Sequence, residues 1–188
     1  PWDEASVDIL ESFNVAGYKI ASADLTNHAL LRYIASTGKP MLCSTGMATE
    51  QEIVESVNVL QNNAAQFVLL HCNSTYPAPF KDINLKYLTK LKKLSGNLVG
   101  YSGHERDINV ALAAVALGAK VIEKHFTVDR TLEGNDHKVS LLPDEFAQMV
   151  SGIEQVFQAL GDAGPRTITQ GEMMNRVTLA KSVYARKD

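Results

Sequence analysis

FVLLHC (67–72) is one of five short hydrophobic runs that decide the fold of this chain, and it ends in a histidine and a cysteine. Each run ends in small or reactive polar residues and precedes a stretch of helical periodicity, which is the βα repeat of a parallel α/β fold. The other runs are YKIAS (18–22), MLCST (41–45), LVGYS (98–102) and VIEKHF (121–126). Since the carboxyl ends of parallel strands open onto one face, we expect eight reactive side chains to crowd one rim: Lys19, Ser22, Ser44, His71, Ser102, His104, Glu123 and His125. A packed core has no need of such chemistry, so the pattern indicates an enzyme.

The spacing of the runs supports a series of βα units. Their first residues are separated by 23, 26, 31 and 23 residues. Five strands are too few to close an eight-stranded barrel, and an open parallel sheet leaves two unprotected edges. Amphipathic helices are predicted at 4–15, after Thr26 or Asn27, after the capping box Thr49–Glu52, at 84–95, at 107–118 with Asp107 as its cap, and at 143–160.

The composition changes after the last predicted helix. Gly161 ends that helix, and a segment rich in Gly, Thr and Pro follows it up to Gly171. The last stretch, NRVTLAKSVYARKD (175–188), has a β-like composition. We therefore expect a partial barrel domain over residues 1–161 and a linker over residues 162–188.

Composition and charge exclude several classes of protein. The 188 residues, 45% hydrophobic and 21% charged, are typical of a globular chain with one sizeable core. The formal net charge of −3 gives no broad basic surface for nucleic acid. No apolar run has the length of a membrane span, and residues 1–17 lack a signal-peptide pattern, so we expect a cytoplasmic protein. Cys43 and Cys72 lie in different predicted strands, which favours reduced core thiols over a disulfide or a nucleophile.

Six segments together resemble the N-acetylneuraminate (sialic acid) synthase family. They are YKIAS with the acid and TN after it (18–27), GKPMLCSTGMAT (38–49), LLHC with its Tyr-Pro-Ala-Pro (69–79), GYSGH (100–104), ALGAKVIEKHFTVDR (116–130) and DHKVSL (136–141). The resemblance covers nearly the whole chain in the family's order. It implies a phosphoenolpyruvate-condensing (β/α)8 barrel of the TIM type, followed by a small antifreeze-like domain. On that template the chain is a truncated barrel of about five βα units plus a linker, without the first strands and the C-terminal domain.

An anion site is expected around Lys19. A lysine within a strand that points into a barrel mouth binds a phosphate or carboxylate as a point charge. A lysine that merely snorkels to the surface is the structural alternative. The resemblance implies that serines surround phosphoenolpyruvate with it, of which the last varies between subfamilies: Ser22, Ser44, Ser102 and Ser74.

A metal site is expected at His104 and His125. They follow two consecutive predicted strands, so their imidazoles can meet at the rim and hold a divalent cation. The resemblance implies Mn²⁺, with Mg²⁺ or Co²⁺ as alternatives, whereas either histidine taken alone is as well explained as a core residue. Family members commonly carry Ser-Asp-His where this chain has Ser-Gly103-His. A carboxylate beside the metal ligand is therefore lost, unless Glu105 replaces it.

Three residues are candidates for catalysis. The resemblance implies that Asp24, where many relatives carry Glu, binds the sugar or manages the proton of a metal-bound water. It also implies a place for His71 near the reacting groups, although a hydrogen-bonded core histidine is the alternative. Alternation along VIEKHF turns Glu123 and His125 toward the barrel interior and Lys124 toward a helix, so Glu123 is the third candidate.

The acceptor sugar is expected on the same rim. The resemblance implies that it contacts Tyr76, Asp136 and His137, of which the last two are otherwise explained as a turn. These roles predict condensation of phosphoenolpyruvate with N-acetylmannosamine or a related hexose to a nine-carbon 2-keto acid and phosphate. Hexose precursors of legionaminic- and pseudaminic-type sugars are equally compatible with the sequence.

Two other interpretations stay open. A Schiff-base aldolase would use Lys19 or Lys124 as its nucleophile. Alternatively, the chain is an inactive fragment that needs a partner segment to complete the barrel. Because open sheet edges tend to pair with other chains, we expect a homo-oligomer, most simply a dimer.

Overall fold

Five parallel strands form one curled sheet, and they coincide with the five predicted runs. The computed structural model describes residues 1–181. The strands are β1 (Tyr18–Ile20), β2 (Met41–Ser44), β3 (Phe67–Cys72), β4 (Val99–Gly103) and β5 (Val121–Lys124). They pair in chain order, always in parallel, so β1 and β5 are the two edges. The architecture is a half-barrel of the TIM type.

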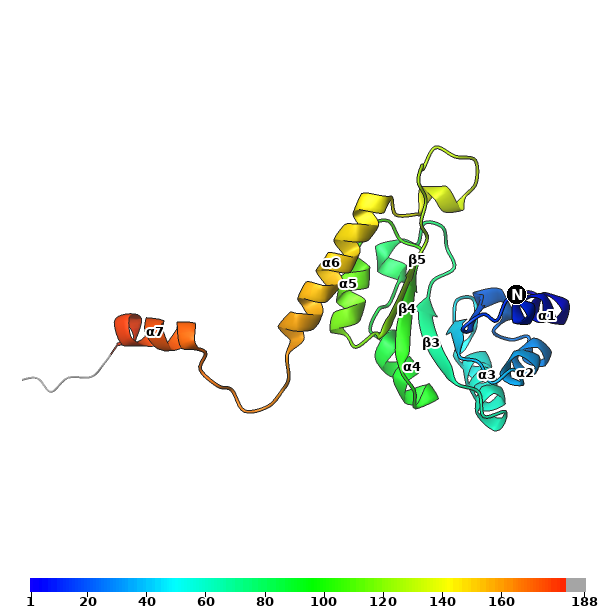
Figure 1. Ribbon diagram of the computed structural model, residues 1–188, viewed down its shortest axis with the longest axis horizontal. Helices are drawn as coiled ribbons and strands as arrows, with labels where there is room; N and C mark the ends of the chain where they lie inside the picture. The colour runs from blue at the N-terminus through cyan, green and yellow to red at the C-terminus, as the bar shows by residue number, and fades with distance from the viewer. Residues whose placement is uncertain (182–188) are drawn as a thin grey trace, which may run out of the picture.

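Helices connect the strands and pack against the outer face of the sheet (Figure 1). Short 3₁₀ helices η1, η2 and η3 lie in the loops after β1, β3 and β5, at Ser22–Asp24, Phe80–Asp82 and Asp136–Lys138. Within the described residues, α6 lies beside α5. The helices up to that point, all near their predicted positions, are α1 (Glu4–Ser12), α2 (His28–Ala35), α3 (Glu50–Asn62), α4 (Tyr87–Ser95), α5 (Asn109–Ala116) and α6 (Pro143–Leu160).

The capping residue predicted for α3 is confirmed, and the one predicted for α5 is not. The predicted capping box of α3 is present, since the Glu52 amide donates to Thr49 Oγ1 and the Thr49 amide donates to Glu52 Oε2. The prediction that Asp107 caps α5 is wrong. Its backbone adopts φ 84°, and its carboxylate accepts from the adjacent Ile108 amide, so α5 begins only at Asn109.

Side chains alternate between two different environments along each strand. One set points outward and builds the hydrophobic core with the helices, as Ile20, Cys43, Leu69 and Tyr101 do. The neighbouring residues point into the half-barrel. The sheet therefore separates an apolar outer layer from an inner face that is open to polar chemistry.

The segment after α6 differs from its predicted conformation. A helix, α7 (Gln170–Leu179), takes up the first part of the stretch that we expected to be β-like. A capping box between Thr169 and Glu172 begins it, and this local signal prevails over the β-like composition. The end of the stretch, residues 182–188, lies outside the described residues.

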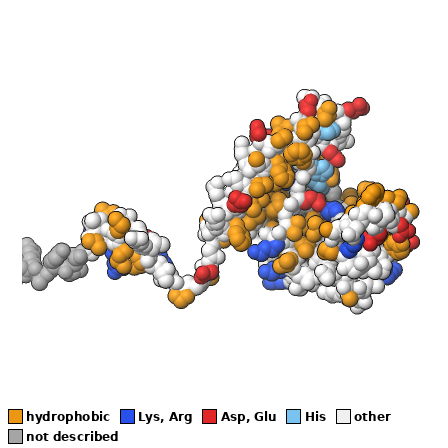
Figure 2. All heavy atoms as spheres, in the orientation of Figure 1, with side chains coloured by type: hydrophobic (Ala, Val, Ile, Leu, Met, Phe, Trp, Pro, Cys, Tyr) orange, Lys and Arg blue, Asp and Glu red, His pale blue; other side chains and the backbone are white. Residues whose placement is uncertain are grey.

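Helices α6 and α7 carry exposed hydrophobic side chains. Phe157 of α6 is 61% exposed and Val177 of α7 is 80% exposed. Figure 2 shows hydrophobic side chains on the visible face of both helices, and Figure 1 shows α7 apart from the sheet. No helix within residues 1–181 combines the length and the apolar character that crossing a membrane requires.

Candidate active site

A cavity of about 400 Å³ opens where the carboxyl ends of the five strands meet. This is the end at which parallel barrels carry their active sites. Every strand or the loop directly after it contributes to the wall, as the sequence pattern predicted. The lining residues are Trp2, Lys19, Ala21, Ser22, Ala23, Ser44, Met47, Cys72, Ser74, Tyr76, Ser102, His104, Glu123 and His125.

Lys19 and Glu123 approach each other across this cavity. Lys19 Nζ lies 3.8 Å from Glu123 Oε1, and it donates a hydrogen bond to the Ile20 carbonyl oxygen at 2.8 Å. Ser102 Oγ donates to the same Glu123 oxygen at 2.7 Å. Both ionic side chains are about one-third exposed. The ammonium is thus oriented by the protein and still accessible to an incoming anion.

Hydroxyl groups and a backbone amide lie around this lysine. The Gly46 amide donates to Ser22 Oγ at 3.1 Å. A Cβ at Gly46 would lie 2.1 Å from Ser74 Oγ and 2.7 Å from Ser22 Oγ, so only glycine lets these groups come together. Ser44 Oγ is buried and has no hydrogen-bond partner among the described residues. Since buried hydroxyls normally have partners, Ser44 Oγ is a candidate donor to a bound ligand.

His104 is held in one tautomer by the loop after β3. Its Nδ1 lies 2.7 Å from the Asn73 carbonyl oxygen. A carbonyl can only accept, so Nδ1 carries the proton and Nε2 carries the lone pair. Burial raises the pKa of Tyr76 and keeps its hydroxyl protonated, and this hydroxyl lies 3.0 Å from Nε2. The lone pair of Nε2 therefore accepts a hydrogen bond from the Tyr76 hydroxyl at the cavity wall.

His125 faces His104 across the rim. The ring centroids are 5.2 Å apart at an interplanar angle of 61°. Burial lowers the pKa of both histidines below the ordinary value, against the opposing effects of the Asn73 carbonyl and of Asp136. Both rings are consequently neutral at pH 7, which is the form that binds a metal ion.

The three residues predicted to contact the acceptor sugar do not all line the cavity. Asp136 Oδ2 lies 3.8 Å from His125 Nδ1, and its side chain is 68% exposed. His137 does not line the cavity, because its Nδ1 lies 2.8 Å from Thr127 Oγ1 within its own loop. Of the three residues expected to contact the sugar, Tyr76 alone is part of the cavity wall.

Two of the three catalytic candidates are not brought into the cavity. His71 points to the outer face of β3, where its ring lies between Tyr87 and Tyr101 and its Nε2 donates to the Ile83 carbonyl at 2.5 Å. It is the hydrogen-bonded core histidine of the alternative interpretation. Asp24 is buried in η1 and does not line the cavity, although its Oδ2 has no partner among the described residues. Glu123 is the candidate that the structure places in the cavity.

Several parts of the wall were not predicted. Cys72 lies in the cavity, where its sulfur accepts from Ser22 Oγ at 3.6 Å, whereas Cys43 is the outward-facing core thiol. Burial raises the pKa of Cys43 to about 12. Both cysteines are unpaired within the described residues, as expected. Trp2 also lines the cavity, and no periodicity in the sequence connects it to the strands.

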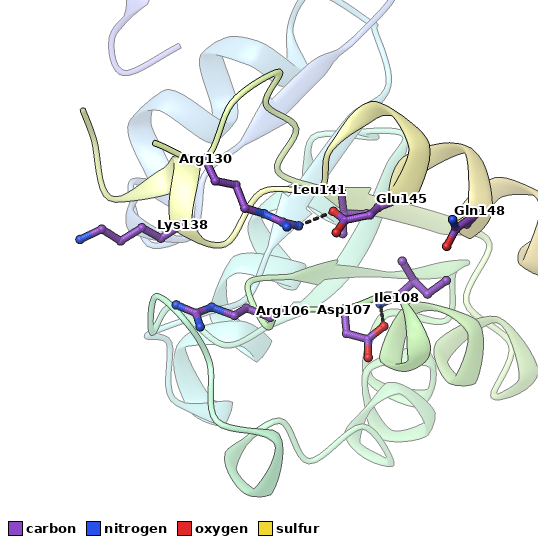
Figure 3. Close-up of a pocket in the computed structure, with 8 residues that line it drawn as sticks. All are labelled: Arg106, Asp107, Ile108, Arg130, Lys138, Leu141, Glu145 and Gln148. Carbon is purple, nitrogen blue, oxygen red and sulfur yellow. Dashed lines mark hydrogen bonds and ion pairs between the residues drawn. The ribbon is translucent and has the colours of Figure 1, made fainter. Parts of the chain in front are cut away.

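A larger cavity of about 550 Å³ is lined by residues of the loops after β4 and β5 and of α6 (Figure 3). Arg106, Arg130 and Lys138 line it together with Asp107 and Glu145. The Arg130 guanidinium is bound to the Glu145 carboxylate and to the Ser140 carbonyl oxygen. None of the predicted site residues lines this second cavity within the described chain, so the cavity at the strand ends is the candidate active site.

Comparison with known proteins identifies a family with this architecture. The model of the NeuB family matches residues 1–164. The chain is 45% identical over 191 residues to the N,N′-diacetyllegionaminic acid synthase of Campylobacter jejuni, covering 100% of this chain and 57% of that protein. It is 38% identical to the N-acetylneuraminate-9-phosphate synthase of Homo sapiens, covering 98% of this chain and 51% of that protein. The chain thus spans about half the length of these relatives.

A solved structure is similar to this chain in both fold and sequence. The crystal structure of N-acetylneuraminic acid (sialic acid) synthetase from Leptospira borgpetersenii, in complex with citrate, superposes with a TM-score of 0.86 at 38% sequence identity. The match covers 97% of this chain and 65% of that chain. By its sequence, its parallel half-barrel and its place among these synthases, the chain belongs to the NeuB family.

Proposed function

We propose that this chain forms part of a synthase that condenses phosphoenolpyruvate with N-acetylmannosamine or a related hexose. The product would be a nine-carbon 2-keto sugar acid, released together with phosphate. One observation carries the proposal. A single cavity holds an oriented ammonium, an unpartnered buried hydroxyl and two neutral imidazoles, from Lys19, Ser44, His104 and His125.

The ammonium and the hydroxyls suit phosphoenolpyruvate. Its phosphate and carboxylate are both acceptors, and Lys19 supplies charge while the serines supply O–H donors. The buried Ser44 Oγ would donate to one of these acceptor oxygens. Both anionic groups are attached at C2, so their binding to Lys19 and the serines would leave C3 of the enol facing away from Lys19.

The two imidazoles suit a divalent cation, for which we propose Mn²⁺. His104 and His125 would hold it, since both rings are neutral and line one cavity. The cation would replace the Tyr76 hydroxyl as the partner of the His104 Nε2 lone pair. Residues 1–181 contain no cluster of three or more His, Cys, Asp or Glu side chains in an arrangement that could hold a metal. When bound, such a cation polarises the aldehyde oxygen of the open-chain sugar.

The bonds change at C3 and C2 of phosphoenolpyruvate. The π electrons of the enol form a bond from C3 to the aldehyde carbon, and the π pair of the aldehyde moves onto its oxygen, which takes up a proton from solvent. C2 is left electron-deficient. Water adds to C2, and we assign the acceptance of its proton to Glu123, whose carboxylate is fixed by Ser102 at 2.7 Å. The tetrahedral carbon then loses phosphate by cleavage of the C2–O bond, while the new C2 hydroxyl gives up its proton to the departing phosphate and becomes the keto group.

The aldolase alternative loses one of its two nucleophiles. The Lys124 side chain is fully buried and paired with Glu105, so no substrate can reach its nitrogen. Lys19 stays accessible, and trapping with borohydride and pyruvate distinguishes the two mechanisms at that position.

The substrate requirement tests the proposal. The complete gene product, with Mn²⁺ and phosphoenolpyruvate, is assayed for phosphate release with and without N-acetylmannosamine and its N-acylated analogues. We expect release only when an acceptor hexose is present. Release at the same rate without a sugar, or none with any hexose tested, would contradict a condensing synthase.

A further inference from the structure

A fully buried ion pair lies directly behind the candidate active site. Lys124 Nζ lies 2.9 Å from Glu105 Oε1, and neither side chain has any exposed surface. The same ammonium donates to the Glu105 carbonyl oxygen at 2.6 Å, and Tyr101 Oη donates to Glu105 Oε2 at 2.6 Å. The charges and both carboxylate oxygens are therefore satisfied within one small network.

The pair is attached to the two histidines through the backbone. Glu105 directly follows His104, and Lys124 directly precedes His125. Lys124 is paired in register with Gly103 of β4. Because neighbouring residues of a strand point to opposite faces, the pair lies on the outer face of the sheet, opposite the imidazoles. The two hydrogen bonds from Lys124 to Glu105 connect the carboxyl ends of β4 and β5, next to His104 and His125 in the sequence.

Gly103 makes room for this network. A Cβ at position 103 would lie 2.7 Å and 2.8 Å from the two Glu105 carboxylate oxygens and 2.8 Å from Tyr101 Cε1. Any side chain at 103 would displace the carboxylate. The glycine and the glutamate are thus linked, and Glu105 fills the volume that an acidic residue at 103 would take.

Close packing behind the site does not by itself require charged side chains at Glu105 and Lys124. Well-packed hydrophobic residues of similar volume often stabilise a protein as well as a buried ion pair does, since desolvation offsets the Coulomb attraction. Hydrogen bonds from a charged pair, in contrast, are strongly directional and define a distance between two strands. A pair that fixes the distance between β4 and β5 also fixes the geometry of the adjacent His104 and His125.

We propose that Glu105 and Lys124 are positioning residues that fix the spacing and orientation of the His104 and His125 rings. This inference rests on the proposed function in so far as the two rings hold a cation for the condensation. Neither residue touches the substrate, and each acts through the histidine next to it in the chain.

The test uses the double variant E105Q/K124M in the complete gene product. It removes both charges at nearly constant volume, and the amide oxygen of Gln still accepts from Tyr101, so no single charge is left buried. The control is E11Q/K39M, which removes the distant Lys39–Glu11 pair at 2.8 Å. Urea unfolding first establishes that each variant is folded.

Two readouts decide the matter, and one of them needs no metal. In histidine-labelled, metal-free protein, we expect the nuclear Overhauser effect between the His104 and His125 rings to be lost in E105Q/K124M and kept in the control. We also expect the Kd for Mn²⁺, measured by calorimetry, to rise by about tenfold or more, the scale seen when groups that orient ligands are removed. Phosphoenolpyruvate binding, followed by the fluorescence of the cavity residue Trp2, should stay close to the parent value.

A folded double variant with an unchanged ring contact and an unchanged Kd for Mn²⁺ would overturn the positioning role and leave the proposed function intact. Absence of condensation in the parent would instead count against the proposed function, and the metal-free ring contact would still decide the positioning role. If the double variant fails to fold, the conservative variant K124R is measured in the same way. Parental ring contact and affinity in K124R, whose larger planar guanidinium cannot take the place of the fully buried ammonium without moving Glu105, would equally refute the proposal.

Discussion

Lys19 Nζ and Glu123 Oε1 lie 3.8 Å apart although they belong to β1 and β5, the two edge strands of the sheet. Strands at opposite edges of a flat five-stranded sheet would be separated by four interstrand spacings of about 4.8 Å each. Their side chains meet because the sheet is curled into a half-barrel. The curl therefore brings the predicted anion-binding lysine and the predicted catalytic carboxylate into one cavity.

Replacing Lys19 should weaken the binding of phosphoenolpyruvate selectively. Lys19→Met keeps the length of the side chain and removes its charge, so we expect a loss of about 1.5–3 kcal/mol, or roughly 10- to 150-fold in Kd. Sugar binding should change little. Titration calorimetry of both substrates measures this, with Lys39→Met, which lies outside the cavity, as the control. An equal loss for both substrates would identify Lys19 as a structural residue.

Replacing either cavity histidine should abolish metal binding without unfolding the protein. We expect His104→Ala and His125→Ala to raise the Kd for Mn²⁺ by more than about 100-fold, since loss of groups that merely orient ligands costs roughly 10- to 100-fold. Calorimetry with Mn²⁺ gives the affinity. His28→Ala is a matched control, because His28 does not line the cavity. Its Nε2 lies 3.2 Å from Ser56 Oγ. Parental affinity in both cavity variants would refute the assignment.

His71 should make the protein less stable in mild acid. Burial lowers the pKa of its imidazole in the folded state below the ordinary value near 6.5. As the pH falls below that value, the unfolded chain binds a proton that the folded chain does not, so the free energy of unfolding decreases. The slope from one such group is at most about 1.4 kcal/mol per pH unit.

The variant His71→Gln isolates this contribution. Gln retains an N–H donor for the Ile83 carbonyl and does not titrate, so urea unfolding between pH 7.5 and 5.5 should show a shallower dependence than the parent. A residual slope is expected from His104 and His125, whose pKa values burial also lowers. Identical slopes in parent and variant would mean that His71 does not contribute.

The open edges predict the behaviour of the 188-residue chain when it is expressed alone. β1 and β5 each pair on one side only within the described residues, and unpaired edges associate with other strands. We expect the isolated chain to be oligomeric or to unfold at low denaturant concentration. Sedimentation velocity and urea unfolding test this. A monodisperse, cooperatively unfolding monomer of 20.5 kDa would contradict it.

The strands and the sidedness of VIEKHF could be predicted from the sequence. Each run combines β-forming residues with a polar end, and the period of two places Glu123 inside and Lys124 outside. In FVLLHC the same rule was insufficient. Both faces of β3 are buried, so the pattern does not show whether His71 or Cys72 points inward. The register with β4, which pairs Cys72 with Ser102, decides it.

Other parts of the site depend on groups that side-chain identity does not reveal. The Asn73 carbonyl fixes the tautomer of His104, and the Gly46 amide orients Ser22. Backbone groups of this kind are present at every residue, so their role follows only from the path of the loop. The partnership of Glu105 with Lys124 likewise depends on two strands lying side by side.

The position of bond cleavage in phosphoenolpyruvate tests the central claim most directly. Substrate labelled with ¹⁸O in the oxygen that bridges C2 and phosphorus is incubated with the complete gene product, Mn²⁺ and N-acetylmannosamine. Mass spectrometry then locates the label. We predict that it leaves in inorganic phosphate, because water adds to C2 and the C2–O bond breaks. Label retained in the keto acid would show cleavage of the P–O bond and would contradict the condensation proposed for this cavity.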